Sequence, residues 1–115
     1  MSDVSLNPPT AANQPALNPD DVFWLLGDPS RRRVLLALHS GAALAASQLR
    51  GAVGLRQAAT EKHLTHLLKA GLLVAAPDER DKRRMLYRLS PSVAVVKTET
   101  GAAMDFGCCL VRLNS

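Results

Sequence analysis

Between positions 18 and 70 the apolar residues recur three or four apart, and short polar segments with proline or glycine interrupt them. This spacing predicts four short helices, because residues three or four apart share one helix face. Asn18-Pro19 and Asp28-Pro29 each combine a capping side chain with a proline suited to the first helical turn. The predicted helices cover positions of about 18–27, 28–41, 45–52 and 57–70.

Beyond Gly71 the pattern is typical of strands. Positions 72–75 and 85–89 are rich in apolar residues and flank a polar, charged loop at 77–83. Two such runs separated by a polar loop predict a β-hairpin. Two helices joined by a tight turn therefore precede a hairpin with a charged tip.

The segment after Pro91 has a weaker pattern. β-Branched residues and Gly101 favour a second hairpin, formed by 93–98 and 104–113, over a terminal helix. The predicted fold class is α+β: a winged helix-turn-helix with four helices, a wing β-hairpin and a C-terminal β-segment.

A chain of 115 residues has room for one domain. We expect residues 1–17, which are rich in proline and asparagine, to form a disordered N-terminal arm. Residues 18–90 form the predicted DNA-binding domain. Residues 91–115 form a C-terminal extension and a candidate dimerisation element, because a small core gains buried area by oligomerisation.

The composition excludes several classes of protein. No apolar run approaches the roughly 20 residues that span a bilayer, and the N-terminus has no secretory signal. The two cysteines, Cys108 and Cys109, are adjacent and cannot join distant parts of the chain. We therefore expect a cytoplasmic protein. Because no phosphate-binding loop, Ser-His-Asp set or paired carboxylates are visible, we expect neither an enzyme nor a cofactor.

The helix at 57–70 and the hairpin tip carry groups suited to double-stranded DNA. A helix fits the major groove, where Gln can pair with adenine and Glu can accept a hydrogen bond from cytosine. A cationic loop can follow the phosphate backbone or enter the minor groove. The 14 basic and 10 acidic residues leave a net charge of +4, and part of the excess lies in this loop. The predicted DNA contacts are Arg56, Gln57, Thr60, Glu61, Lys62, His63, Thr65, Arg80, Lys82, Arg83 and Arg84.

A family resemblance rests on three stretches of this region. The opening of ArsR-type winged-helix repressors, L-x-D-P-T-R-x-x-I-L, resembles Leu26-Gly27-Asp28-Pro29-Ser30-Arg31-Arg32-Arg33-Val34-Leu35. The recognition helix of that family resembles Leu55-Arg56-Gln57, Lys62-His63-Leu64 and Leu67-Leu68-Lys69-Ala70-Gly71-Leu72. The segment 78–84 is similar to the wing of MarR-type repressors. The resemblance implies sequence-specific DNA binding as a homodimer and a repressor role.

The chain departs from this family where some of its members sense metals. Ala45-Ala46-Ser47-Gln48 occupies the place of a Cys-x-Cys pair, and no histidine follows His66. His63 and His66 are three residues apart on one helix, but no further ligand completes a set. We therefore predict no metal site, and the sequence leaves open whether a small molecule or metalloid is an effector.

Two other functions stay open. A winged helix can be a protein-interaction module that does not bind DNA, and Glu61 on the predicted recognition face is compatible with that role. A thiol- or metalloid-responsive regulator would use Cys108 and Cys109, since thiolates bind soft ions. In a continuous strand over 104–113, however, these neighbours would point to opposite faces.

Two further expectations concern the first two helices. Arg31, Arg32 and Arg33 are interpreted as residues that cover a surface, rather than as phosphate contacts. Trp24 is expected to pack in the domain core or in a dimer interface.

Overall fold

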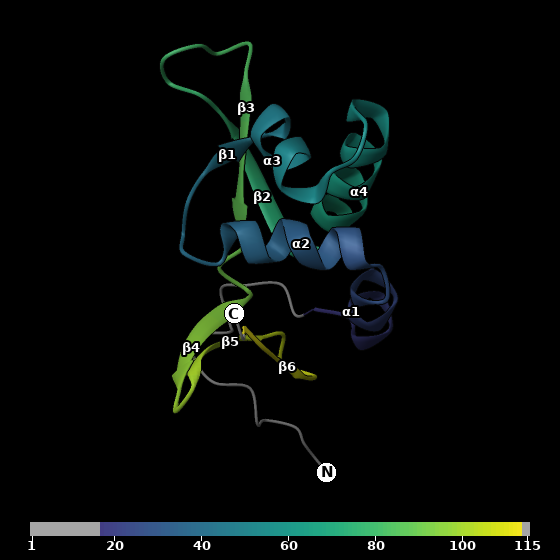
Figure 1. Ribbon diagram of the computed structural model, residues 1–115, viewed down its shortest axis with the longest axis vertical. Coiled ribbons are helices and arrows are strands. Elements are labelled where there is room, and N and C mark those ends of the chain that lie inside the picture. Colours follow the sequence, from purple (N-terminus) through teal and green to yellow (C-terminus); the bar gives the residue numbers. More distant parts are fainter. Residues whose placement is uncertain (1–16, 114–115) are drawn as a thin grey trace.

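The structure, a computed structural model, describes residues 17–113 (Figure 1). The helices are α1 (Pro19–Leu26), α2 (Pro29–Leu38), α3 (Ala46–Val53) and α4 (Gln57–Lys69). The strands are β1 (Leu44–Ala45), β2 (Leu73–Pro77), β3 (Met85–Leu89), β4 (Ala94–Thr98), β5 (Gly101–Asp105) and β6 (Leu110–Arg112). The predicted winged-helix arrangement of four helices, a wing hairpin and a C-terminal β-segment is confirmed. The predicted disordered arm lies, apart from Leu17, outside the described residues.

Local chemistry explains how the helices begin and end. The Asn18 side chain accepts hydrogen bonds from the Asp20 and Asp21 amides, at 2.8 and 3.3 Å. The Asp28 side chain likewise accepts one from the Ser30 amide, at 2.7 Å. The turn between α3 and α4 is tight because Gly54 has a φ of 73°, a left-handed conformation that favours glycine. The side-chain hydrogen bonds of Asn18 and Asp28 confirm the two predicted N-caps.

The first sheet forms the wing. Its strand order is β1-β3-β2, and all pairs are antiparallel. The register of the hairpin aligns Leu73 with Leu89 and Pro77 with Met85. The two-residue strand β1, which aligns Leu44 with Tyr87, joins the start of α3 to the wing. Sequence analysis missed β1 because two residues carry no periodic signal.

The second sheet has the order β4-β5-β6, again with antiparallel neighbours. The predicted strand over 104–113 is wrong, because a turn divides it into the end of β5 and β6. In this turn the Phe106 amide donates to the Cys109 carbonyl at 2.9 Å, and Gly107 has a φ of 86°. The Asp105 carboxylate accepts a hydrogen bond from the Gly107 amide at 2.8 Å. The left-handed conformation of Gly107 and its hydrogen bond to Asp105 thus form the turn.

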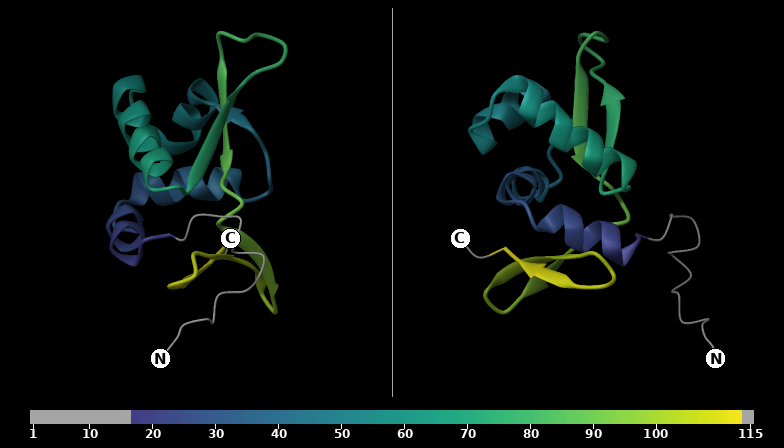
Figure 2. Two further views of the ribbon diagram at one scale, coloured as in Figure 1. Left: turned by 180° about the vertical axis from the view of Figure 1, so that it is seen from behind. Right: turned by 90° about the vertical axis from the view of Figure 1, so that its right-hand side faces the viewer.

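One hydrophobic core holds the helices and both sheets together. Leu35 and Leu38 of α2, Leu49 of α3 and Leu64 of α4 are buried at its centre. Three residues of the C-terminal region belong to the same buried cluster, namely Val93, Met104 and Phe106. The C-terminal sheet lies on the side of α1 and α2 that faces away from the wing (Figure 2). It is therefore packed into the fold, at the end of the molecule opposite to the wing tip.

Candidate nucleic-acid interface

Helix α4 and the wing tip lie at the same end of the molecule, with α3 between them (Figures 1 and 2). Leu64 and Leu67, 1% and 0% exposed, anchor the inner face of α4 in the core. The polar face therefore points to solvent, and its exposed members are Gln57, Glu61, Lys62 and Thr65, with Arg56 at the N-cap. The geometry required for entry into a groove, a polar helix face beside a cationic hairpin, is present.

Two contacts organise this polar face. The Gln57 amide nitrogen donates to the Glu61 carboxylate at 3.0 Å. The Thr65 hydroxyl donates to the Glu61 backbone carbonyl at 2.9 Å. The Gln57 side chain is thereby oriented along the helix surface. The bond to Glu61 uses one of the two amide N–H groups, so the second N–H and Oε1 remain to pair with a base edge.

The structure corrects the predicted role of Thr60. Its side chain is buried, with 1% of the residue exposed, and its hydroxyl donates to the Arg56 carbonyl at 3.0 Å. Thr60 therefore stabilises the first turn of α4 from inside and cannot reach a base. The prediction of a DNA contact is wrong because Thr60 lies on the same face of the helix as Leu64 and Leu67.

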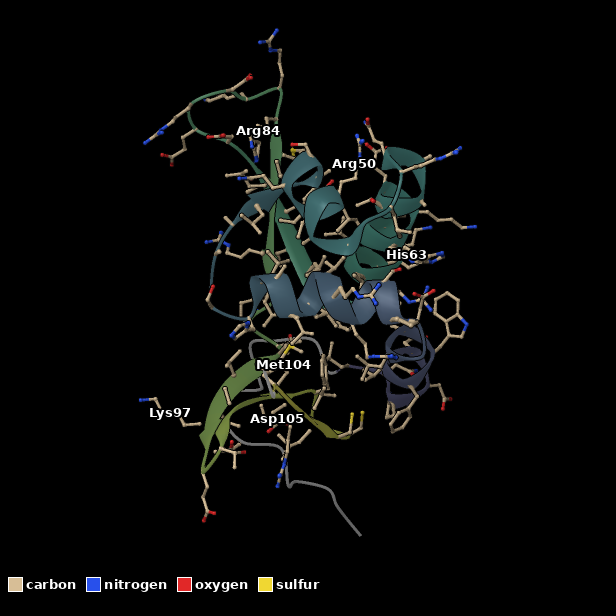
Figure 3. All side chains as sticks on the ribbon, in the orientation of Figure 1. Arg50, His63, Arg84, Lys97, Met104 and Asp105 are labelled. Atoms are coloured by element: carbon tan, nitrogen blue, oxygen red, sulfur yellow. The ribbon has the colours of Figure 1, made fainter. Side chains whose placement is uncertain are left out.

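His63 also faces inward. Its Nδ1 lies 3.3 Å from Nη1 of Arg31, and the ring is half-buried between α4 and the first two helices (Figure 3). Burial lowers the pKa of His63 below its usual 6.5, and the charges of Arg31, His66 and Lys62 act in the same direction, whereas Asp28 raises it. His63 is therefore a contact between α4 and α2, and the structure does not place it among the exposed residues of the polar face.

Arg31 occupies a place opposite to that expected, and Trp24 lies outside the domain core, so of its two expected places only a dimer interface remains. Arg31 is only 7% exposed, whereas Trp24 is 57% exposed. Arg31 donates to the carbonyls of Leu25 and Trp24, at 2.8 and 3.1 Å, and Arg32 donates to that of Leu26. The two arginines thus add donors to the last carbonyls of α1, two of which otherwise accept only the longer bonds from the Gly27 and Asp28 amides, at 3.3 and 3.4 Å. The prediction that Arg31 covers a surface is wrong, because Arg31 donates to carbonyls of α1, and the sequence of α2 does not indicate a contact with another helix.

The wing loop is shaped by two aspartates. The carboxylate of Asp78 accepts from the Arg80 amide at 2.9 Å, and that of Asp81 accepts from the Arg83 amide at 3.1 Å. The Arg83 side chain, 92% exposed, also pairs with Asp81. Arg80 and Lys82 form no ion pair with any residue in 17–113, so their charges face solvent.

Two residues of α3, Gln48 and Arg50, belong to this end of the molecule and were missed by sequence analysis, and Arg50 adds a positive charge to it. The Gln48 side chain accepts from the Ala45 amide at 2.9 Å and from Nη2 of Arg84 at 3.2 Å, so it ties the wing to α3. Arg50 is exposed at the same end of the molecule as Arg84 (Figure 3). Its position in the polar half of α3 is the signal that could have identified it.

Comparison with known proteins places this geometry in a family. Residues 26–74 match the family model described as a helix-turn-helix domain. The arsenic resistance transcriptional regulator ArsR1 of Pseudomonas putida is 35% identical over 77 residues, which are 67% of this chain and 58% of that relative. The chain thus spans less than two thirds of the length of ArsR1.

Solved structures agree with the sequence match. The cadmium metal-sensor CMTR of Mycobacterium tuberculosis is 33% identical, with a TM-score of 0.52, over 64% of this chain and 72% of that one. The chain belongs to the ArsR-like winged helix-turn-helix family. A homodimeric winged helix-turn-helix domain of Mycobacterium bovis, Mb0332, shares the fold at 23% identity and a TM-score of 0.54, over 61% of each chain.

The cysteine pair of this ArsR-like chain lies in the turn between β5 and β6. Both thiols are free; Cys108 is exposed and Cys109 half-buried. Their sulfur atoms lie 3.9 Å apart, with the Cys108 thiol donating to Cys109. Burial raises the pKa of the Cys109 thiol, and Cys108 and Asp105 raise it further. Because the predicted strand is interrupted here, the two thiols lie side by side and not on opposite faces.

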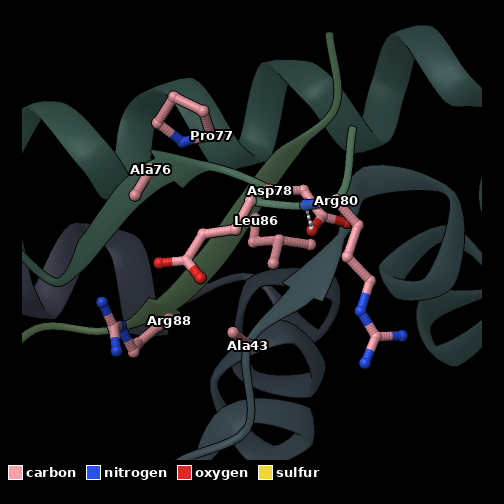
Figure 4. Close-up of a pocket in the computed structure, with 8 residues that line it drawn as sticks. Ala43, Ala76, Pro77, Asp78, Arg80, Leu86 and Arg88 are labelled. Carbon is pink, nitrogen blue, oxygen red and sulfur yellow. Dashed lines mark hydrogen bonds between the residues drawn. The ribbon is translucent and has the colours of Figure 1, made fainter. Parts of the chain in front are cut away.

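A metal site and a pocket are two further kinds of site that residues 17–113 could contain. Within residues 17–113 no group of three His, Cys, Asp or Glu side chains could hold a metal ion, and no helix there is long and apolar enough to cross a bilayer. A hollow of about 330 Å³ lies beside the wing strands (Figure 4). Arg80 and Arg88 line it together with Asp78 and Glu79, so its charges oppose one another.

Proposed function

We propose that this ArsR-like protein is a transcriptional regulator, a repressor, that binds double-stranded DNA as a homodimer in the cytoplasm. The observation that carries the proposal is the placement of the polar face of α4 and the cationic wing at one end of the molecule. Helices of this kind enter the major groove, and adjacent loops contact the backbone. The family of the chain supports the same function.

Each exposed residue then has a role set by its chemistry. Gln57 suits adenine and Glu61 suits cytosine, so these two side chains read bases. Lys62, Thr65 and Arg56 contact phosphates or base edges from the same helix. The wing residues Arg80, Lys82, Arg83 and Arg84 neutralise phosphates, and Arg50 adds a further positive charge.

The homodimer would form through α1 and the C-terminal sheet. Phe23 of α1 and Leu110 of β6 are 56% and 60% exposed. Strand β6 lies beneath α1, so the two side chains belong to one end of the molecule (Figures 1 and 2). Trp24 of α1 and Val95 and Val96 of β4 are exposed as well, so α1 and the second sheet together present the apolar side chains that we assign to the contact with a second copy. A second copy would place two α4 helices about one DNA turn apart, which favours a palindromic site.

The deciding experiment is a gel-shift titration with duplexes selected from a random pool. We expect Arg83→Ala together with Arg84→Ala to weaken binding to all duplexes and to reduce its salt dependence, because phosphate contacts release counterions. The matched control is Arg33→Ala with Lys69→Ala, which removes the same charge from exposed positions outside the wing and outside the proposed dimer surface. Gln57→Ala should instead change the preferred sequence.

Two results would contradict this proposal. If the wild-type protein shifts no duplex at low salt, the chain is a protein-interaction module. If the wing pair and the control pair weaken binding equally, net charge and not the wing accounts for the affinity.

A second candidate, regulation by a thiol-binding effector, is favoured by the adjacent thiols of Cys108 and Cys109. Sulfur atoms 3.9 Å apart in an exposed turn can bind one thiophilic centre such as trivalent arsenic. One clue to the ligand class is that ArsR1 is an arsenic resistance regulator. Titration with phenylarsine oxide should release wild-type protein from DNA, but not the Cys108→Ser or Cys109→Ser variant. Equal release of all three proteins would exclude the cysteine pair.

A further inference from the structure

Helix α4 is joined to the first two helices by a polar cluster that DNA binding does not explain. Its centre is the guanidinium of Arg31, which lies 4.3 Å from the ring centroid of Trp24 and donates to two carbonyls of α1. The same guanidinium reaches His63 of α4, with Nη1 and Nδ1 3.3 Å apart. His66 of α4 meets the Trp24 ring edge to face, with centroids 5.1 Å apart. Two residues of α4 are thus held by one tryptophan-arginine pair.

The chemistry of arginine fixes the state of this contact. A guanidinium carries only donors and stays charged at any physiological pH, so Nδ1 of His63 must accept. An accepting Nδ1 means a neutral imidazole that carries its proton on Nε2. If His63 gains a second proton, Nδ1–H faces a guanidinium N–H, and the hydrogen bond between α2 and α4 breaks.

We propose that Arg31 is a positioning residue for DNA recognition, which holds α4 at its binding angle through the neutral ring of His63. The inference rests on the proposed function, since it assigns α4 to DNA. The contact is suited to this task because Arg31 is anchored independently of α4, through the α1 carbonyls and Trp24. Breaking the hydrogen bond to His63 therefore loosens the polar link between α2 and α4, while Leu64 and Leu67 still hold α4 in the core and α1 and α2 stay joined.

Several charged groups face His63 and set the direction of its titration. Arg31 lies on α2 and Asp28 at its N-cap, with Arg31 Nη1 4.0 Å from the Asp28 carboxylate. Lys62 and His66 lie on α4 itself, whereas Trp24, from α1, is uncharged. Burial lowers the pKa of His63, Asp28 raises it, and Arg31, His66 and Lys62 act in the same direction as burial. The neutral ring that the hydrogen bond requires is therefore the favoured form at neutral pH.

The first test compares Arg31→Met with Arg33→Met, the same substitution at an exposed position of the same helix. Affinity is measured against a duplex that the wild-type protein selects from a random pool, at a temperature where all variants are folded. We expect Arg31→Met to weaken binding about five- to tenfold, in the range of typical coupling between sites. Arg33→Met should stay within about twofold of the wild type.

The second test separates positioning from simple stabilisation. His63→Gln keeps an oxygen that can accept from Arg31 but does not titrate. Between about pH 7.5 and pH 5.5, where histidine titrates, the affinity of the wild type should fall relative to that of His63→Gln. A histidine that merely adds positive charge near DNA would produce the opposite trend. In NMR spectra of the free protein at neutral pH, His63 should carry its proton on Nε2, and Arg31→Met should speed amide exchange in α4.

The outcomes distinguish the two proposals. If the wild type selects no duplex, the regulator function is wrong, and the tautomer of His63 and the exchange of α4 still decide whether Arg31 holds the helix. If the wild type binds DNA but Arg31→Met binds equally well, or if the wild type and His63→Gln share one pH profile, the regulator function stands and the positioning role is wrong.

Discussion

The two ends of the molecule are built from different chemistry. At one end, α4 and the wing expose polar and cationic side chains whose geometry is fixed by local hydrogen bonds, such as those of Asp78 and Asp81. At the other end, α1 and the second sheet expose large apolar side chains, including Phe23 and Leu110. The first surface suits a polyanion and the second suits a protein. Binding of DNA and association of copies can therefore be altered separately, and this separation can be tested.

The largest effect is expected where the polar end is anchored in the shared core. Leu64 is 1% exposed and holds α4 against the other helices. Leu64→Ala should lower the free energy of unfolding by about 2–5 kcal/mol, because it removes buried side-chain atoms and leaves a cavity. Urea unfolding followed by circular dichroism measures this decrease. A decrease below about 1 kcal/mol would show that α4 is not held by the core.

Next in size is an effect on association alone. Phe23→Ser with Leu110→Ser should weaken the dimer about tenfold or more, since large side chains at an interface centre carry most of the binding energy. Sedimentation equilibrium without DNA measures the change. Met85→Ser, which alters an exposed apolar side chain of the wing, is the control. A dimer weakened equally by the control would place the interface elsewhere.

A smaller effect is expected from two cations of the wing loop. Arg80→Ala with Lys82→Ala should reduce the slope of log affinity against log salt by up to about 0.9 for each phosphate that the variant no longer neutralises. The dimer constant should stay unchanged. If dimerisation is weakened and the salt slope is not, the two ends do not have the separate roles proposed for them.

The smallest effect concerns Asp28, which lies between the two ends at the start of α2. Its hydrogen bond from the Ser30 amide lowers the pKa of Asp28 below its usual 3.8. The lowered pKa means that this stabilisation is complete well above pH 3.8 and is lost as the pH falls through and below that value. Asp28→Ala should cost about 1 kcal/mol at neutral pH, as for a typical N-cap, and less in acid. A cost that does not change with pH would exclude the carboxylate as the source.

Sequence patterns predicted the parts of the structure that depend on neighbours along the chain. The caps at Asn18 and Asp28 and the turn at Gly54 were readable because each acts within a few residues. The exposed face of α4 followed from helical periodicity, although Thr60 shows that a polar residue can lie on the buried side. The broken C-terminal strand could have been predicted from Gly107.

The remaining features depend on contacts between distant elements. Arg31 is buried because its guanidinium donates to carbonyls at the end of α1, and no pattern within α2 indicates that contact. Strand β1 forms because its two residues pair with β3, which is distant along the chain. The same reasoning applies to Gln48, whose function becomes visible only when the wing places Arg84 beside it.

The two aspartates of the wing loop have a consequence for the thermodynamics of binding. By holding backbone amides they restrict the loop before any ligand arrives, so less conformational entropy is lost on association. Their negative charge simultaneously reduces the attraction of the loop for any polyanion. Asparagine at positions 78 and 81 would keep an accepting oxygen and remove both charges. Such a loop would retain its shape and hold all nucleic acids more tightly, at the expense of discrimination among them.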